Sequence, residues 1–353
     1  MNVSDSEAIA GWYEEKGWEQ AKSINEADEV IINSCSVRES AENRVFGLVN
    51  NLSKLKTINL ELKKTKIILT GCMLRYSSKW LKEKVPNVDE FKKISEFHVS
   101  SSKFYVSKSQ LHAYVPIMNG CNNFCSYCVV PSARGREISR PLRDIICEAE
   151  RLAERGYKEI TLLGQNVNSY GKDIKDFSRQ WRDFVATQQF SNYKTKFKTL
   201  FAVLLEVLNK IVGIEKISFL TSNPWDLNDD IIEAMALPKI DRFLHLPVQS
   251  GDDTILKKMN RKYTAADYLK LIEKIKKRIP ETIFGTDIIV GFPGETEKQF
   301  DNTVELCKKV GFKKAYVNIY SPRRGTVAFK LKEEIPFSEK RKRWKILDDL
   351  INK

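Results

Sequence analysis

Short apolar runs recur along the second part of the chain, and a helical stretch separates each run from the next. Runs of this length are typical of strands buried in a parallel sheet. Strands that alternate with helices indicate a (β/α) barrel or open barrel, whose chemistry lies at the carboxyl ends of its strands. The runs lie at residues 158–163, 215–220, 241–247, 283–290 and 314–320.

A smaller unit of the same kind comes first. The run Val30–Ile32 ends in Asn33-Ser34-Cys35, and the run Ile67–Leu69 ends in Thr70-Gly71-Cys72. A helix from about Val37 lies between them, and we expect another over 4–17, capped by Ser4. Strand, helix and strand at this spacing predict a parallel α/β unit with both cysteines at its carboxyl edge. Either cysteine could be an ordinary buried thiol, but their equivalent positions favour a shared site.

The composition limits the class of protein. A chain of 353 residues that is 42% hydrophobic and 30% charged suggests a globular protein of two domains, or a barrel with an appendage. No apolar run is long enough to span a membrane, and the seven cysteines show no disulfide framework. We therefore expect a cytoplasmic protein, and its net charge of +13 favours a polyanionic partner.

Cys121, Cys125 and Cys128 are spaced C-x-x-x-C-x-x-C in a loop after the predicted strand 113–118. Three thiolates can hold three corners of a four-iron cluster and leave one iron open. The alternative is structural zinc, which closes at four ligands. The triplet has no evident fourth partner and the chain has only three histidines, so iron–sulfur is favoured. A non-catalytic, zinc-bound RNA-binding protein remains as a distant alternative.

The motifs around the triplet resemble those of the radical S-adenosylmethionine (SAM) superfamily and, more narrowly, of the methylthiotransferases. The resemblance runs from Met1 to about Lys353 in a fixed order of segments. These are NSCSVRESAENRVFG from Asn33, TGCM from Thr70, MNGCNNFCSYCVVPSARGREISRP from Met118, LLGQNVNSYG from Leu162, TSNP from Thr221, HLPVQSGDDTILKKMNRKYT from His245 and TDIIVGFPGET from Thr286.

The resemblance implies an α/β fold in three parts. Residues 1–99 would form a parallel α/β methylthiotransferase domain, truncated at its start, and residues 100–336 a radical SAM partial (β/α) barrel. Residues 337–353 would form a C-terminal helix, without the RNA-binding TRAM module that usually follows in the family. The polar stretch 86–110 would connect the first two parts.

The resemblance also implies the cofactors. Cys121, Cys125 and Cys128 would hold a [4Fe–4S] cluster whose open iron binds SAM. Cys35 and Cys72 match two of the three ligands of the family's second, sulfur-donating [4Fe–4S] cluster. The third lies in a G-C-Q-M-N segment, and this sequence begins just after it, so we expect impaired sulfur donation.

The implied activity is methylthiolation of an adenine. The CSVRE and GQNVNSYG stretches resemble the branch that modifies C2 of N6-isopentenyladenosine at position 37 of tRNA. The other branches modify a ribosomal protein or threonylcarbamoyladenosine in tRNA. Each product consumes two SAM, because one gives the 5′-deoxyadenosyl radical and the other gives the methyl group. We expect a monomer that receives electrons from a donor such as flavodoxin or ferredoxin.

Because cofactors carry such chemistry, no side chain is predicted to be catalytic. Cys307 is expected in a core, and Cys147 has no assigned role. Tyr127 and Asp287 are candidate SAM contacts, although loop packing and a satisfied barrel polar group are their alternatives. Arg134 and Arg136 suit RNA phosphates, although a solvated turn explains them nearly as well. The remaining candidates for SAM or substrate are Gln165, Asn166, Gln249 and Arg261.

Overall fold

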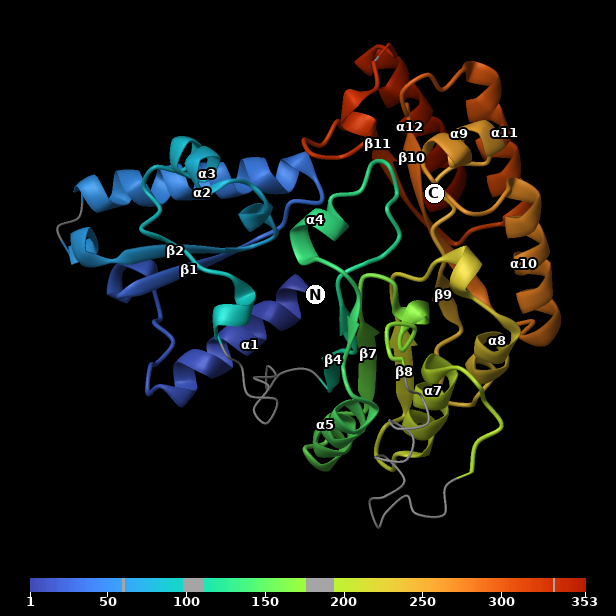
Figure 1. Cartoon of the computed structure of the whole chain (residues 1–353), viewed down its shortest axis with the longest axis horizontal. Helices are drawn as coiled ribbons and strands as arrows, with labels where there is room; N and C mark the ends of the chain where they lie inside the picture. Colours follow the sequence, from blue (N-terminus) through green and yellow to red (C-terminus); the bar gives the residue numbers. More distant parts are fainter. Residues whose placement is uncertain (59–60, 98–110, 176–193, 333) are drawn as a thin grey trace. The chain divides into compact units, whose positions relative to one another are not determined.

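The computed structural model describes residues 1–353 except 59–60, 98–110, 176–193 and 333 (Figure 1). The chain divides into two compact units. The first comprises Met1–Lys108 together with Val129–Gly135, and the second comprises Ser109–Cys128 together with Arg136–Lys353. The predicted boundary at 99/100 lies outside the described residues. In the part of the chain that the structure describes, no helix is long and apolar enough to cross a membrane.

The first unit is built on a parallel sheet in the order β1-β2-β3. Its strands are β1 (Glu29–Ser34), β2 (Lys66–Gly71) and β3 (Glu90–Phe91). Its helices are α1 (Asn2–Glu15), α2 (Glu39–Ile58), α3 (Ser78–Lys84) and α4 (Val130–Arg134), with short 3₁₀ turns η1 (Ile24–Glu26), η2 (Glu61–Lys64), η3 (Cys72–Arg75) and η4 (Ile94–Phe97).

The core of this unit lies between the sheet and α2. Ile67 and Leu69 of β2 pack with Val49 and Leu52 of α2, all of them buried. The predicted strands and the helix between them are therefore confirmed. The predicted helix 4–17 instead begins at Asn2 and ends at Glu15, and Ser4 lies buried inside it rather than capping it.

The second unit contains six parallel strands that neighbour one another in chain order. Sheets β4-β7-β8 and β9-β10-β11 are joined by a parallel bridge between Ile217 and Ile240. The six strands are β4 (His112–Pro116), β7 (Glu159–Leu163), β8 (Lys216–Phe219), β9 (Phe243–His245), β10 (Ile283–Val290) and β11 (Lys314–Ile319). This arrangement confirms the predicted partial (β/α) barrel.

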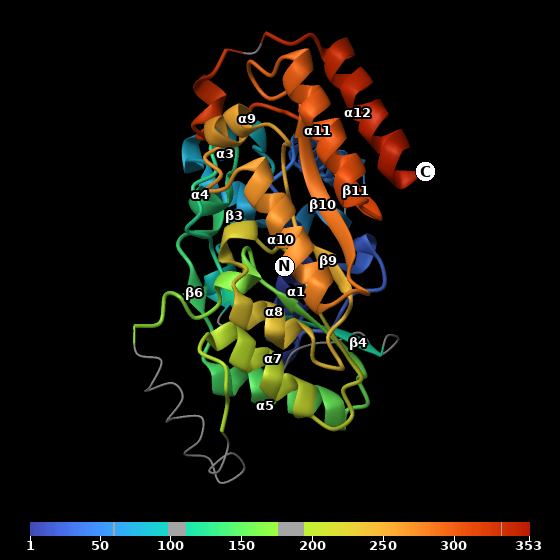
Figure 2. The ribbon, with the colours of Figure 1, turned by 90° about the vertical axis from the view of Figure 1, so that its right-hand side faces the viewer.

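Helices follow one another along one side of these strands (Figures 1 and 2). The predicted apolar stripe of α5 is confirmed, because Leu142, Ile145, Ala149 and Leu152 are all buried. In the described residues of this unit, the helices are α5 (Leu142–Glu154), α7 (Leu200–Lys210), α8 (Asp229–Met235), α9 (Asp253–Lys258), α10 (Ala265–Arg278), α11 (Glu297–Val310) and α12 (Phe337–Asn352), with 3₁₀ turns η5 (Val167–Ser169), η7 (Pro224–Asp226) and η8 (Ala328–Lys330).

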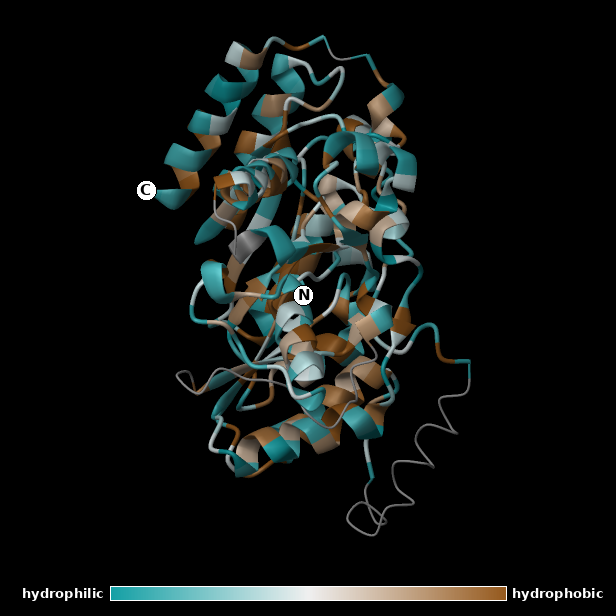
Figure 3. Cartoon of the chain, turned by 90° about the vertical axis from the view of Figure 1, so that its left-hand side faces the viewer, coloured by the Kyte–Doolittle hydropathy of each residue, from teal (hydrophilic) through white to brown (hydrophobic). Residues whose placement is uncertain are grey.

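The C-terminal helix α12 packs against β11, the outer strand of its sheet. Trp344 Nε1 donates to Val317 O at 2.8 Å, and Asn352 Nδ2 donates to Ala315 O at 2.8 Å. Hydrophilic residues dominate the ribbon of this helix in Figure 3. An amphipathic helix thus covers a sheet edge whose free backbone groups would otherwise invite pairing with another strand.

Candidate functional site

The cysteine triplet lies in a loop that is fastened at both ends. The short strand β5 (Met118–Asn119) leads into the loop and pairs antiparallel with β6 (Ile138–Ser139). Asn122 N donates to Glu137 Oε1 at 3.2 Å, and Glu137 N donates to Asn122 Oδ1 at 3.3 Å. Glu137 could not be singled out from the sequence, because a pairing across 15 residues leaves no local signal.

A second segment, Met259-Asn260-Arg261, supports the middle of the loop. Met259 O accepts from Ser126 N at 3.0 Å, and Asn260 Nδ2 donates to Phe124 O at 2.8 Å. Arg261 Nη1 donates to Cys125 Sγ at 3.4 Å. Asn260 has a positive φ of 57°, a conformation that asparagine tolerates better than most residues. Three consecutive residues therefore hold the loop that carries the thiols.

Arg261 is a buried cation with a fixed orientation. Its Nη2 donates to Pro247 O at 3.1 Å, and its Nε donates to the Tyr263 hydroxyl at 3.2 Å. The guanidinium carbon lies 4.6 Å from the centre of the Trp225 ring. Arg261 thus places a rigid hydrogen-bond donor beside the Cys125 sulfur. The predicted contact of Arg261 with SAM or substrate stays a prediction.

The residues of the triplet fit an iron–sulfur cluster. Cys121 Sγ accepts a hydrogen bond from Asn123 N at 3.5 Å. One sulfur of the triplet is thus bonded by a backbone donor, and another, that of Cys125, by a side-chain donor. Burial raises the pKa of the Cys121 thiol to about 11, and a bound metal would displace that proton. Among the described residues, no three Cys, His, Asp or Glu side chains converge on one point as a single ion requires. In an iron–sulfur cluster, each of three such thiolates would bind a different iron.

Within the described part of the same unit, two buried amide oxygens have no hydrogen-bond partner. They are Oδ1 of Asn166, which follows β7, and Oε1 of Gln249, which follows β9. Asn166 is held by its Nδ2, which donates to Asp226 Oδ2 at 2.6 Å. Gln249 has a φ of 67°, and its backbone bonds to Asp287 O and Ile289 N on β10. Buried acceptors without donors are costly, so a ligand that carries amino and hydroxyl donors would relieve both.

The other predicted SAM contacts are placed differently. Asp287 Oδ2 lies 2.8 Å from His245 Nε2, an arrangement that favours the satisfied polar group. Tyr127 is half-buried and packs against an apolar cluster that includes Met259 and Phe292, which favours loop packing. Gln165 is half-buried just after β7.

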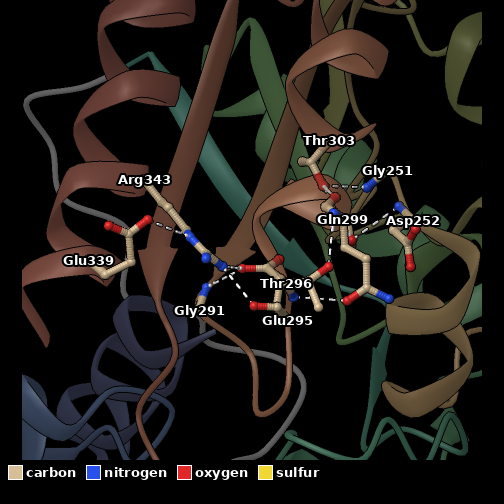
Figure 4. A network of polar contacts seen from close by, with 10 residues as sticks. Gly251, Asp252, Gly291, Glu295, Thr296, Gln299, Thr303, Glu339 and Arg343 are labelled. Carbon is tan, nitrogen blue, oxygen red and sulfur yellow. Dashed lines mark hydrogen bonds and ion pairs between the residues drawn. The ribbon is translucent and has the colours of Figure 1, made fainter. Parts of the chain in front are cut away.

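The loop after β10 is fixed by a polar network (Figure 4). Gly291 N donates to Glu295 Oε2 at 2.8 Å, and Arg343 Nη1 donates to the same oxygen at 2.9 Å. Gly291 has a φ of +69°, and a Cβ added there would collide with the buried side chain of Lys340. Helix α12 therefore holds the GFPGET loop of the barrel in place.

The first unit carries its own thiol pair. Ser34 and Gly71 are register partners at the ends of β1 and β2, and Cys35 and Cys72 are the residues that follow them. Gly71 has a φ of +88°, and a Cβ there would lie 2.6 Å from Asn33 Oδ1. The predicted placement of both cysteines at the carboxyl edge of one sheet is confirmed.

The two arginines that were predicted to contact RNA have different surroundings. Arg134 belongs to the first unit, its side chain is 7% exposed, and its Nη2 donates to Asp5 Oδ2 at 2.6 Å. Arg136 is exposed and lies 4.5 Å from the centre of the Phe124 ring. Arg136 is thus the better placed of the two for a phosphate.

Comparison with known proteins agrees with this geometry. Residues 115–307 match the Radical SAM superfamily, and residues 1–92 match a family described as Uncharacterized protein family UPF0004. The structure of the radical S-adenosylmethionine methyltransferase TsrM from Kitasatospora setae aligns with a TM-score of 0.56 at 14% identity, over 90% of this chain and 70% of that one. The cobalamin-dependent S-adenosylmethionine radical enzyme OxsB aligns with a TM-score of 0.56 at 10% identity, over 92% and 51%. The fold and the triplet site define a radical SAM enzyme.

Proteins of similar sequence identify the family within the radical SAM enzymes. The tRNA-2-methylthio-N(6)-dimethylallyladenosine synthase of Thermoanaerobacter sp. (strain X514) is 42% identical over 381 residues, which span 100% of this chain and 76% of the relative. The proteins of the same name from Clostridium tetani and Carboxydothermus hydrogenoformans are also 42% identical, and the match spans 79% and 81% of their lengths. The chain belongs to the family of the tRNA-2-methylthio-N(6)-dimethylallyladenosine synthases.

Proposed function

We propose that the protein attaches a methylthio group to C2 of N6-isopentenyladenosine at position 37 of tRNA. The observation that carries this proposal is the presence of a thiol site in each unit, on a chain that matches the tRNA-2-methylthio-N(6)-dimethylallyladenosine synthases over its full length. The net charge of +13 supports a polyanionic substrate. Arg136, exposed near the triplet loop, is a candidate phosphate contact.

The two thiol sites bind different clusters in this proposal. Cys121, Cys125 and Cys128 hold the [4Fe–4S] cluster that binds SAM, and Cys35 and Cys72 supply ligands to a second [4Fe–4S] cluster. When bound, these groups supply the radical chemistry at C2 and the sulfur, for which side-chain acid–base chemistry is too weak. Two SAM molecules are used for each product. An external donor such as flavodoxin or ferredoxin provides the electrons, and the protein acts as a monomer in the cytoplasm.

The protein's own side chains hold the cysteine loop in place and orient SAM in this proposal. Arg261 fixes Cys125 through its hydrogen bond, and the segment Met259–Arg261 keeps the loop in one conformation. Asn166 and Gln249 offer their unpaired oxygens to the amino group and ribose hydroxyls of SAM. Gln165 lines the approach to that site in this proposal, whereas Tyr127 and Asp287 keep the loop-packing and polar-pair roles that their contacts favour. Such preorganised polar groups position a reactive ligand without reorganising during the reaction.

The test is nucleoside mass spectrometry after anaerobic reconstitution of both clusters. The full chain is supplied with SAM, a reductant and tRNA that carries N6-isopentenyladenosine. We expect 5′-deoxyadenosine from the wild type and from Cys147→Ala, whose cysteine has no assigned role. We expect 2-methylthio product from both in low yield, because Cys35 and Cys72 match two of the three expected ligands of the second cluster. Cys121→Ala should give neither, whereas Cys72→Ala should still give 5′-deoxyadenosine without methylthio product.

The alternatives give other results. Product on threonylcarbamoyladenosine tRNA or on a ribosomal protein, with isopentenylated tRNA unchanged, would move the chain to another branch. Zinc in place of iron after anaerobic purification, without 5′-deoxyadenosine, would indicate a non-catalytic RNA-binding protein.

A further inference from the structure

Two phenylalanine rings are exposed at the cysteine loop of the second unit. Phe124 lies in the loop itself, between Cys121 and Cys125, and is 47% exposed. Phe329 lies in η8, the turn after β11, and is also 47% exposed. A single exposed apolar residue is ordinary, but two exposed aromatic rings at one site favour a binding surface.

A buried alanine fixes η8 to the cysteine loop. Ala328 N donates to Ser126 O at 2.7 Å, and the Ala328 side chain is fully buried in an apolar cluster. Its neighbours along the chain, Val327 and Phe329, are 69% and 47% exposed. The rings of Phe124 and Phe329 are thus carried by two segments that are hydrogen-bonded to each other.

Phe124 is held by its backbone, while its ring stays exposed. Its carbonyl oxygen accepts from Asn260 Nδ2 at 2.8 Å. The guanidinium carbon of the exposed Arg136 lies 4.5 Å from the centre of the ring. A cation and a flat base can share one aromatic ring, because each interacts with a face of its π-system. This pair therefore suits a ligand that carries both a base and a phosphate.

Further exposed cations lie close to the two rings in the chain. They follow the cysteine loop, flank the supporting segment Met259–Arg261 or end η8, and they are Arg136, Lys257, Lys258, Lys262 and Lys330. Of the carboxylates nearby, Glu137 and Glu295 are buried, and Asp253 accepts from Ala265 N at 2.7 Å. Aromatic rings among exposed cations are the combination that binds single-stranded nucleic acid.

We propose that Phe124 and Phe329 stack on unpaired bases of the RNA substrate, while the surrounding cations contact its phosphates. The proposal rests on the proposed function, because it takes RNA as the partner of this site. It adds that the site accepts an unpaired loop rather than a duplex, whose bases are stacked inside the helix. Stacking tolerates every base, so these two rings position the loop without reading its sequence.

The experiment measures RNA binding rather than turnover. The full chain, with its clusters reconstituted anaerobically, is titrated into two fluorescently labelled RNAs, and anisotropy is recorded at several salt concentrations. One RNA is a hairpin whose unpaired loop carries N6-isopentenyladenosine, and the other is a fully paired duplex of the same length. Phe124→Ala and Phe329→Ala remove the rings, Phe329→Trp keeps an aromatic face, and Lys330→Gln removes a cation. Phe337→Ala, the control, removes an exposed ring at the start of α12.

We expect Phe124→Ala and Phe329→Ala each to weaken hairpin binding by about 5-fold to 150-fold and to leave duplex binding unchanged. Their salt dependence should equal that of the wild type, because a ring neutralises no phosphate. Lys330→Gln should weaken binding of both RNAs and reduce the slope of log affinity against log salt by about 1. Phe329→Trp should retain hairpin binding, and Phe337→Ala should match the wild type.

Each contrary outcome has its own meaning. Unchanged hairpin binding by Phe124→Ala and Phe329→Ala, with methylthio product still formed on isopentenylated tRNA, would overturn this inference alone. Equal weakening of hairpin and duplex, together with a lowered Tm, would assign the rings to packing and also overturn it. Displacement of the hairpin by polyglutamate as readily as by unlabelled hairpin would show a surface for negative charge only, again against the inference. If the wild type prefers neither RNA and forms no methylthio product, the proposed function fails, and this inference fails with it.

Discussion

Arg343 of α12 and Glu295 of the loop after β10 form an ion pair at 2.9 Å, with side chains only 6% and 1% exposed. Burial raises the pKa of Glu295, while the Gly291 amide and the Arg343 cation oppose that effect. Each partner therefore stabilises the buried charge of the other, which would be costly without it. It fastens the C-terminal helix to a loop at the carboxyl end of a barrel strand.

Arg343→Met should lower the free energy of unfolding by about 3–5 kcal/mol, because it leaves the Glu295 carboxylate buried without its cation. Urea unfolding followed by circular dichroism measures the change. Arg341→Met on the same helix is the control, since Arg341 is exposed and should change stability by about 0.5 kcal/mol or less. Equal effects of the two variants would show that the buried pair contributes little.

Gly291→Ala should destabilise the protein more than Gly311→Ala. Both glycines have a φ of +69°, so each alanine meets the same backbone strain of about 1–2 kcal/mol. Only at Gly291 does the new Cβ collide with Lys340, whereas nothing lies within 4 Å at Gly311. Overpacking should add about 1–3 kcal/mol at Gly291. Equal losses of unfolding free energy in the two variants would mean that Lys340 moves aside.

Cys307 should resist alkylation in the folded protein, whereas the half-buried Cys147 should react with iodoacetamide. Burial raises the pKa of Cys307 from 9.0 to about 12, so its thiolate is scarce below that pH. Mass spectrometry of tryptic peptides after labelling at pH 8 measures both sites. Rapid labelling of Cys307 without unfolding would contradict its burial.

The same shift predicts a pH dependence of stability. The unfolded thiol of Cys307 ionises above pH 9, while the folded thiol keeps its proton, so unfolding is favoured as pH rises from about 9 to about 12. This residue therefore stabilises the fold fully below pH 9 and loses that contribution above it. Unfolding curves at pH 8 and pH 10 should differ more for the wild type than for Cys307→Ala. If the free energy of unfolding changed equally with pH in both proteins, the raised pKa of Cys307 would be refuted.

Arg261→Gln should weaken the cluster on the triplet, because it removes the donor to Cys125 and leaves a thiolate without its cation. In a Cys35→Ala/Cys72→Ala background, the chelator concentration that removes half of the iron should fall by about 10-fold to 100-fold. Lys262→Gln changes the exposed neighbour and should have no effect. Arg261→Lys should recover only part of the loss, because lysine lacks the planar fork. If Arg261→Gln impairs SAM binding alone, with iron retained, the arginine serves the substrate instead.

The order of strands and helices could be predicted because each is encoded locally. The run Ile283–Val290 is apolar enough to indicate a strand by itself, and the stripe of α5 has helical spacing. By contrast, β3 is two residues long and lies in a stretch that was predicted to be a polar connection. A strand of that length has no periodicity, so only its pairing with β2 reveals it.

The triplet could be predicted from its spacing, but its supports could not. Asn260 and Phe124 are 136 positions apart, and their hydrogen bond exists only because the fold brings two loops together. The surroundings of Arg134 were equally hidden, since a basic residue after a cysteine loop suggests a surface. Burial of that side chain against Asp5 depends on the packing of α4, which no local pattern encodes.

The assignment of Val129–Gly135 to the first unit means that the backbone passes between the units three times. A single cut after Lys108 would therefore not release an independent barrel. The excised fragment would keep a seven-residue segment whose packing partner η3 had been removed. Its arginine would lose Asp5, and its first residue directly follows Cys128, the last cysteine of the triplet. Dissection of this protein into separately expressed halves would thus disturb the very loop that such an experiment sets out to isolate.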